Sequence, residues 1–229
     1  TFRKKVSIFG NKYKVHKLIF SSSATVYGNY HKSPLREDME LQSVNPYGST
    51  KIIIEQLISD YAQSNPQFCA MSLRYFNPLG ADIKAGLAEQ PLGEPQNLMP
   101  ILVKSAREKK IFKIFGSNYP TPDGTCIRDY VHVKDLSAAH VIALKQLHQF
   151  PGHRPINLGL GKGASVLEIV KLFEKVNKIK IRYQIVGRRK GDAAISFASN
   201  HLAKKLLDWK PQYNYKDMVQ DSWDGYNKL

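Results

Sequence analysis

The chain has 229 residues, 42% of them hydrophobic, which is enough to bury a sizeable core and excludes a disordered protein. Its formal net charge of +15 favours anionic partners, because summed basic charge raises the local concentration of phosphate-bearing ligands. The sequence shows no apolar stretch long enough to span a bilayer, no signal peptide and no Asn-x-Ser/Thr sequon, so we expect a cytoplasmic protein with no membrane partner.

Nucleic acid is the first anion to consider. The basic residues are dispersed, with local runs at residues 3–5 and 12–17, and no zinc-finger, RNA-recognition or helix-turn-helix signature accompanies them. We therefore expect no nucleic-acid partner, and keep a basic nucleic-acid-binding module as the third alternative. The histidines show no metal-ligand spacing, so we expect no metal, and the two cysteines are too few for a disulfide framework, which indicates a reducing compartment.

The first predicted element is a strand near Lys17 to Phe20, which ends in three consecutive serines, Ser21, Ser22 and Ser23. A short apolar run before hydroxyl side chains is typical of a buried strand that reaches the carboxyl edge of a parallel sheet. Ligands bind at that edge, so the serines are candidate site residues.

The second predicted element is a helix from Pro46 to Ser64, since proline is favoured at the first helical position and apolar residues follow at helical spacing. On it Tyr47 and Lys51 lie four residues apart, on one face. A phenol is a poor base at neutral pH unless a nearby cation favours the phenolate, and Lys51 supplies that cation. The plainer interpretation is a surface pair, which Tyr-x-x-x-Lys alone favours; the upstream serines and the downstream run from Arg74 to Pro78 favour a site.

Further along the chain, a strand at Ala70 to Arg74 continues the strand–helix alternation of the late half of a doubly wound sheet. Residues 79–125 are rich in glycine, proline and polar residues, with one helical patch at 99–107, which is typical of binding loops. We expect a helix after Asp135, with alanines for close packing on a sheet, and another from Val166 to Val176 capped by Ser165.

The glycine cluster at residues 156–163 lacks the spacing of either nucleotide fingerprint, and we expect a structural turn there rather than a phosphate loop. Arg128 lies beside Asp129, and the plainer interpretation of the two taken alone is an internal ion pair. A guanidinium can also donate two hydrogen bonds to an anion. His132 and His140 are expected to be packed or hydrogen-bonded histidines.

From about Val15 to its carboxyl end the sequence resembles the extended short-chain dehydrogenase/reductases and, within them, the UDP-glucose (UDP-galactose) 4-epimerases. Several motifs in the right order are more specific than any one of them. The matching segments, besides the serine strand and the Tyr47 helix, are Leu73 to Pro78, Gln96 to Pro100, Phe115-Gly116, Asp123 to Thr125, Arg128 to Leu136, Asn157 to Gly159 and Arg188 to Asp192.

The resemblance implies an α/β fold: the C-terminal part of a doubly wound, Rossmann-like parallel sheet, plus a smaller α/β substrate-binding domain. Residues 1–78 would form the late half of the NAD-binding domain, with the catalytic residues. Residues 79–229 would form the UDP-sugar-binding domain, of which about 126–148 would pack back on the sheet. The implied cofactor is NAD and the implied partner a UDP-hexose, with a homodimer common in the family.

The implied reaction interconverts UDP-galactose and UDP-glucose. The Tyr47 phenolate removes the proton from the sugar 4-hydroxyl while hydride passes from C4 to NAD. The ring of the resulting keto-sugar then rotates about the pyrophosphate linkage, and hydride returns to its opposite face. Ser23 matches the residue that bridges Tyr47 and the hydroxyl. Lys51 matches the residue that favours the phenolate and holds the nicotinamide ribose. The absence of an acidic residue beside Ser23 disfavours the dehydratase relatives.

The resemblance also assigns the binding residues. Cofactor contacts fall on Ser21, Ser22, Lys51 and Tyr75. Substrate contacts fall on Ser23, Ala24, Thr25, Tyr75, Phe76, Asn77, Gln96, Asn97, Leu98, Lys113, Ile114, Phe115, Arg128, Arg189, Asp192 and Ser196. Ser196 matches a position that limits the volume around the hexose 2-substituent, and because serine is small we expect UDP-N-acetylhexosamines to fit as well.

One part of the family pattern does not occur in this sequence. The Gly-x-x-Gly-x-x-Gly loop that follows the first strand is absent, and on the order of 100 residues, a βαβαβ half, would be required upstream. We therefore expect an exposed sheet edge and keep a second alternative, a catalytically inactive fragment or pseudoenzyme that binds UDP-sugars or a protein partner.

Overall fold

The computed structural model describes residues 15–228, so the basic run at 3–5 and the start of the run at 12–17 lie outside the described residues. The helices are η1 (Ala24–Tyr27), α2 (Pro46–Ser64), α3 (Leu98–Arg107), α4 (Val133–Gln146), η2 (Leu147–Gln149), α5 (Val166–Asn177), α6 (His201–Leu207) and α7 (Tyr215–Lys228). The strands are β1 (Lys17–Ser23), β2 (Cys69–Tyr75), β3 (Asn77–Leu79), β4 (Phe112–Phe115), β5 (Ile127–Arg128), β6 (Tyr130–His132), β7 (Gly152–Leu158), β8 (Ala164–Ser165), β9 (Tyr183–Val186) and β10 (Ile195–Ser196).

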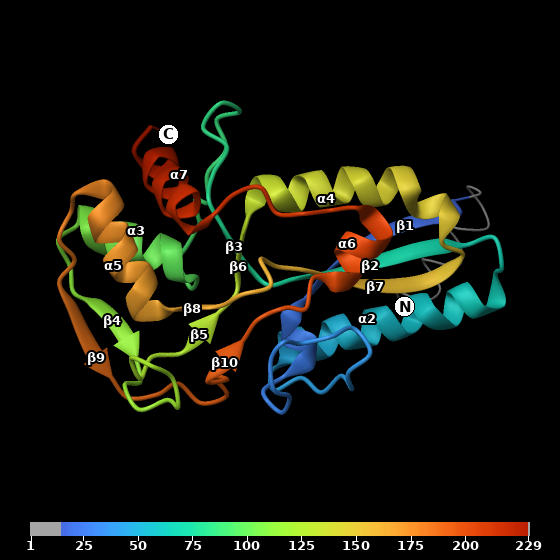
Figure 1. Cartoon of the computed structure of the whole chain (residues 1–229), viewed down its shortest axis with the longest axis horizontal. Helices are drawn as coiled ribbons and strands as arrows, with labels where there is room; N and C mark the ends of the chain where they lie inside the picture. Colours follow the sequence, from blue (N-terminus) through green and yellow to red (C-terminus); the bar gives the residue numbers. More distant parts are fainter. Residues whose placement is uncertain (1–14, 229) are drawn as a thin grey trace.

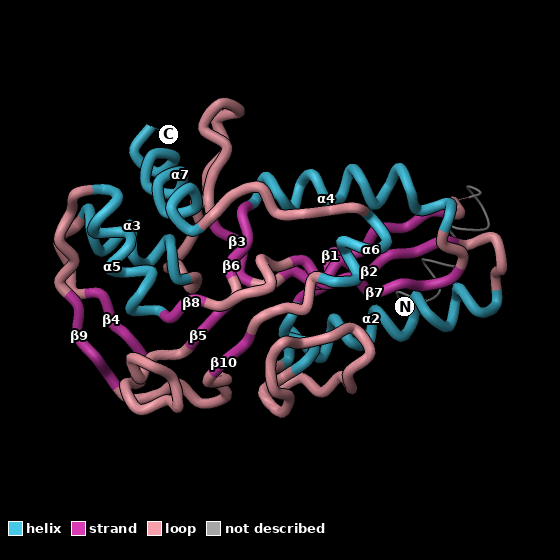
Figure 2. The backbone as a smooth tube through the Cα atoms, in the orientation of Figure 1, coloured by secondary structure: helices cyan, strands magenta, loops and turns pink. Residues whose placement is uncertain are grey.

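The largest sheet is parallel, in the order β1-β2-β7. β2 is buried on both faces. Cys69, Met71 and Leu73 pack with α4 and α6, and Ala70 packs with α2, so the helices cover opposite faces of the sheet (Figure 1). This three-layer arrangement, traced in Figure 2, confirms the predicted α/β class.

The predicted bounds of α2 are confirmed, and β1 is longer than predicted. We expected β1 to end before the serines, but it runs through them, because Ser21, Ser22 and Ser23 pair in register with Leu73, Arg74 and Tyr75 of β2. Successive side chains of a strand point to opposite faces. The three serines therefore have different surroundings, and only Ser23 stands at the strand end.

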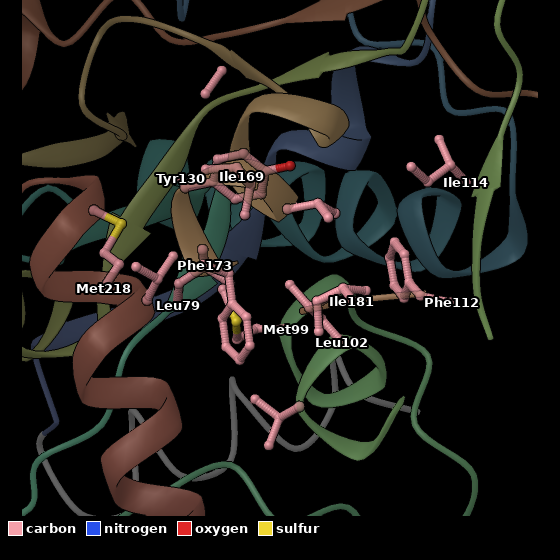
Figure 3. Packing of buried hydrophobic residues seen from close by; sticks show 14 residues of the cluster. Leu79, Met99, Leu102, Phe112, Ile114, Tyr130, Ile169, Phe173, Ile181 and Met218 are labelled. Carbon is pink, nitrogen blue, oxygen red and sulfur yellow. The ribbon is translucent and has the colours of Figure 1, made fainter. Parts of the chain in front are cut away.

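The rest of the chain forms a second, smaller packing unit. Its core gathers α3, α5 and α7 around β4 and β6, with Phe173, Leu102, Ile114 and Tyr130 almost fully buried (Figure 3). Three small sheets surround it, in the orders β10-β5-β8, β3-β6 and β4-β9.

The chain crosses between the two units more often than we expected. Residues 126–148 were predicted to return to the large sheet, and α4 does pack there. β7 is also its third strand, and Leu207 and Trp209, in and just after α6, belong to the same core. A single boundary at residue 78 therefore does not describe which residues pack on the large sheet.

Three findings bear on membranes, metals and disulfides. Within residues 15–228 no helix is long and apolar enough to cross a membrane. Among the same residues no group of three His, Cys, Asp or Glu side chains lies close enough to hold a metal ion. Cys69 and Cys126 are both buried and unpaired.

The turn before α5 is held by a capping box. The Ser165 hydroxyl accepts from the Glu168 amide at 3.0 Å, and the Glu168 carboxylate accepts from the Ser165 amide at 2.7 Å. The same hydroxyl donates to the Asp123 carboxylate, which also accepts from the Thr125 amide in the preceding loop. The predicted cap is confirmed, and it joins α5 to the loop at 121–125.

We predict that Ser165→Ala lowers the free energy of unfolding by about 1–2 kcal/mol, because both the cap and the partner of Asp123 are lost. Urea unfolding would measure the change. Ser64→Ala, at the exposed end of α2, is the matched control and should change stability by less than about 0.5 kcal/mol. Equal losses in the two variants would contradict the capping argument.

Asp129 holds the glycine turn that follows β7. Its carboxylate accepts from the amides of Leu160 (2.7 Å), Gly161 (3.0 Å) and Ala198 (3.0 Å). The glycine cluster therefore donates to a side chain of the protein, as expected for a structural turn. Burial raises the pKa of Asp129 to about 7, against the lowering effect of these three amides.

We predict that this carboxyl makes stability fall as pH rises. Its pKa is about 7 in the folded state against 3.8 ordinarily, so between those values the folded state holds a proton that the unfolded state has lost. Stability should decrease across this window by up to about 4 kcal/mol, and Asp129→Asn should remove that component. Denaturant unfolding at several pH values would measure it, and identical slopes in both proteins would contradict it.

Candidate active site

The carboxyl end of β1 presents two neighbouring hydroxyls. Ser23 caps η1, and its Oγ accepts from the Thr25 amide at 3.3 Å and from the Thr25 hydroxyl at 3.0 Å. Ala24 lies between them, and all three line one cavity. The tight turn into η1 keeps both hydroxyls at the edge of the sheet, where a ligand can reach them.

The start of α2 is fixed against this edge. Asn45 caps the helix by accepting from the Gly48 amide at 2.7 Å, and Pro46 begins it. Gly48 permits a close approach, since a Cβ there would lie 2.0 Å from the Ser43 hydroxyl and 2.8 Å from the Thr25 carbonyl oxygen. The absence of a side chain at Gly48 therefore brings the first turn of α2, with Tyr47, beside η1.

Tyr47 and Lys51 form a pair on this turn. The Lys51 amine donates to the Ser21 carbonyl oxygen at 2.9 Å and lies 5.3 Å from the centre of the Tyr47 ring. It also lies 4.9 Å from the ring of Phe20. Tyr47 is 55% exposed. The plainer interpretation, an unconnected surface pair, is disfavoured because Lys51 binds the strand end.

Tyr75 continues the row of polar groups at the strand ends. Its hydroxyl lies 2.8 Å from the Ser21 hydroxyl and 2.5 Å from Nε2 of His140. Nδ1 of His140 lies 2.7 Å from the Leu136 carbonyl oxygen and so carries the ring proton, which leaves Nε2 to accept from Tyr75. Burial raises the pKa of Tyr75, so this group stays a neutral phenol. The sequence indicated a hydrogen-bonded histidine but not this partner.

Two adjoining cavities lie at this edge. The first, of about 190 Å³, lies between η1, the end of β2 and β10. The second, of about 450 Å³, lies between α3, β4 and β5. Asn77, Arg128 and Asp192 line both, so the two cavities adjoin at these residues, and the pair is called the path from here on. An elongated ligand could occupy both at once.

Paired arginines stand where the cavities meet. An Nη of Arg128 lies 3.6 Å from Asp192, and the Arg189 Nε donates to the same carboxylate at 3.0 Å. The Arg189 guanidinium also stacks over the Phe115 ring at 4.9 Å. Two cations against one carboxylate leave a net positive charge suited to an anion. The alternative of an Arg128–Asp129 ion pair is wrong, because Asp129 accepts from backbone amides instead.

Most of the predicted site residues meet around this path. Those that line the first cavity are Ser23, Ala24, Thr25, Tyr75, Phe76, Asn77, Arg128, Asp192 and Ser196. Those that line the second are Asn77, Gln96, Asn97, Leu98, Lys113, Phe115, Arg128, Arg189 and Asp192.

Of the predicted residues that line neither cavity, Ser21, Tyr47 and Lys51 lie at the strand end described above, and two others point into the interior. The Ile114 side chain is fully buried in the core of the smaller unit, because β4 alternates its side chains between core and cavity. The Ser22 hydroxyl is buried and donates to Glu55. Any ligand contact of Ile114 or Ser22 must therefore come through the backbone.

The structure adds wall residues that sequence reasoning missed. They are Gly28, Val44, Asn45, Gly191 and Ala193 in the first cavity and Ile101, Ile111, Phe112, Cys126, Tyr130 and Val166 in the second. Most are small or apolar and carry no chemical signal in a sequence. Burial raises the pKa of the Cys126 thiol, so it forms a neutral part of the wall.

Comparison with known proteins agrees with this arrangement. The chain is 47% identical over 215 residues to a UDP-glucose 4-epimerase of Dictyostelium discoideum, covering 93% of this chain and 62% of that protein. It therefore spans less than two thirds of the length of this relative.

Solved structures give the same picture. The fold matches a UDP-glucose 4-epimerase of Stenotrophomonas maltophila with bound NAD and formylated UDP-arabinopyranose, with a TM-score of 0.92 and 42% identity over 95% of this chain and 65% of that one. It also matches the Bifidobacterium longum enzyme in complex with NAD+ and UDP, with a TM-score of 0.91 and 40% identity over 99% of this chain and 68% of that one.

The family model described as NAD dependent epimerase/dehydratase matches residues 8–159, well over half of the chain, and includes the serine strand, Tyr47, Lys51 and the large sheet. The chain belongs to the NAD dependent epimerase/dehydratase family.

Proposed function

We propose that this chain carries the catalytic and UDP-sugar-binding part of a UDP-sugar 4-epimerase that interconverts UDP-galactose and UDP-glucose. One observation supports this most: Ser23 lines a path that continues to the paired arginines, and Lys51, which lies beside Tyr47, binds the same strand end. A path that joins a base to an anion site suits a sugar linked to a diphosphate. The relatives, which are named as UDP-glucose 4-epimerases, support the same substrate class.

The residues at the strand ends fit the nicotinamide end of NAD. The Lys51 ammonium has three donors, of which the Ser21 carbonyl takes one, so the others suit ribose hydroxyls. The Ser21 and Tyr75 hydroxyls bond to each other at the same strand ends, and Ser22 would contribute through its backbone. When bound, NAD accepts a hydride from C4 of the hexose and returns it. Two solved relatives are named as containing NAD.

Tyr47 is the group best placed to move a proton. As a phenolate it would accept the proton of the sugar 4-hydroxyl, and as a phenol it would return it. The Lys51 amine lies 5.3 Å from the centre of its ring. The Ser23 hydroxyl stands at the strand end and would orient the sugar hydroxyl.

The two cavities would hold different parts of the substrate. The smaller first cavity would take the hexose and the larger second cavity the uridine, with Arg128 and Arg189 on the diphosphate between them. Binding concentrated on the nucleotide leaves the hexose free to present either face. Gln96, Asn97, Leu98, Lys113 and Phe115 would hold the uridine, Ile114 through its backbone, and Ala24, Thr25, Phe76, Asn77, Asp192 and Ser196 would surround the sugar and its linkage.

A second candidate function is the binding of UDP-sugars without turnover, which the second cavity and the paired arginines would serve as well. UDP affinity with no turnover by the protein made from its complete transcript would favour this candidate. A homodimer and a cytoplasmic location stay predictions.

We predict that Tyr47→Phe lowers kcat for UDP-galactose by about 10²–10⁴-fold, because the proton acceptor is lost, while UDP affinity is unchanged. A coupled assay of UDP-glucose formation and calorimetry with UDP would measure the two quantities. Tyr30→Phe, at an exposed tyrosine outside both cavities, is the control. Turnover by the Tyr47 variant within tenfold of wild type would reject the assigned role.

We predict that the native protein epimerises UDP-N-acetylglucosamine as well as UDP-glucose, because Ser196 is small and lines the cavity assigned to the hexose. Ser196→Tyr should reduce turnover of the acetylated sugar at least tenfold more than that of UDP-glucose, by filling the space of the acetyl group. Comparison of kcat/KM for both sugars tests this. No acetylated turnover by the wild type would remove the hypothesis.

A further inference from the structure

A row of buried polar side chains lies directly beneath the proposed site. In the parallel register Ser22 of β1 pairs with Arg74 of β2, which pairs with Asn157 of β7. All three residues are at most 2% exposed. Paired residues of neighbouring strands project from the same face, so this row faces α2, one position before the strand ends.

Glu55 of α2 reaches into this row. Its Oε1 accepts from the Ser22 hydroxyl at 2.5 Å and from the Arg74 Nε at 3.1 Å, and its Oε2 accepts from an Arg74 Nη at 2.6 Å. The Glu55 and Arg74 side chains are 4% and 3% exposed. One carboxylate therefore joins the helix to two adjacent strands.

The pair is not explained by stability alone. Removing two charges from water is costly, and replacing a buried ion pair with apolar residues of similar volume is often neutral or stabilising. A buried pair can instead select one geometry, because its hydrogen bonds are directional. The relevant geometry here is the position of α2 against the end of β1.

Glu55 lies one helical turn beyond Lys51, on the same face as Lys51 and Tyr47. The Lys51 amine binds the Ser21 carbonyl, and the Glu55 carboxylate binds the hydroxyl of the next residue, Ser22. The helix is thus attached at two consecutive residues of β1, immediately before Ser23. These two attachments fix both the distance of α2 from the strand and its rotation.

The network also reaches the other wall of the first cavity. An Arg74 Nη donates to the Tyr27 hydroxyl at 2.8 Å and to the Glu37 carbonyl oxygen at 3.3 Å. The Tyr27 hydroxyl donates to Asn157 at 2.7 Å. Because Tyr27 ends η1, the same ion pair that positions α2 also holds the turn that carries Ala24 and Thr25.

We propose that Glu55, neutralised by Arg74, is a positioning residue that sets the spacing of Tyr47, Lys51 and Ser23 through its bond to the Ser22 hydroxyl. This inference rests on the proposed epimerase function. Glu55 does not reach the cavities itself, so it acts through the helix and the strand. Its loss should impair the chemical step while nucleotide binding, which depends on the second cavity, is retained.

The test uses the protein made from its complete transcript. Glu55→Met with Arg74→Met removes both charges and fills their space with apolar side chains, and Ser22→Ala removes one hydrogen bond and keeps the ion pair. We expect kcat for UDP-galactose to fall about 100-fold in the first and about tenfold in the second, since small misplacements of reacting groups cost this much. KM and the Kd for UDP should stay within about twofold of wild type. Gln56→Ala, the exposed neighbour on α2, is the control and should change neither.

Three outcomes decide between the explanations. Folded variants with kcat within twofold of wild type would overturn the proposal. A parallel fall of kcat, UDP affinity and the folded fraction would overturn it too, because it would report only a loss of stability. If the wild type itself shows no turnover, the proposed function fails, and amide hydrogen exchange at residues 47–51 decides the positioning role. Exchange should be about tenfold faster in the double variant and unchanged in Gln56→Ala, and equal rates in both would overturn it.

Discussion

The structure depends on the parallel register of β1, β2 and β7. This register places Ser22, Arg74 and Asn157 in one buried row and brings Ser23 and Tyr75 to the edge as neighbours. A shift by one residue would exchange the two faces of each strand and turn Arg74 into the apolar core under α4. The position of every group at the proposed site follows from this alignment.

Two helices pack against opposite faces of this sheet. On one face α4 supplies small and apolar residues, such as Ala139 and Ala143, and also His140, which binds Tyr75. On the other face α2 supplies Tyr47, Lys51 and Glu55, each one turn after the last. The same sheet edge is therefore supported from both sides by polar contacts, with an apolar cluster beneath it on the α4 face and the buried polar row on the α2 face.

The smaller unit completes the site by charge and shape. β5 and the loop before β10 bring Arg128, Arg189 and Asp192 together, and Ser196 of β10 pairs in register with Arg128 of β5. These residues come from segments about sixty positions apart in the chain. Their approach depends on Asp129, whose carboxylate gathers three backbone amides from two later loops.

The sequence by itself determined the family, the α/β class, the bounds of α2, the cap of α5 and most residues of the candidate site, because these depend on local spacing and on motifs that carry side-chain chemistry. It did not determine the length of β1, the burial of Ser22 and Ile114, the partner of Asp129 or the link from Glu55 to Arg74. Tertiary structure decided those, because which face a strand residue occupies and which charges meet depend on pairing between distant segments. Glu55 and Arg74 are ordinary charged residues in the sequence, and only the sheet register makes them a buried pair beneath the site.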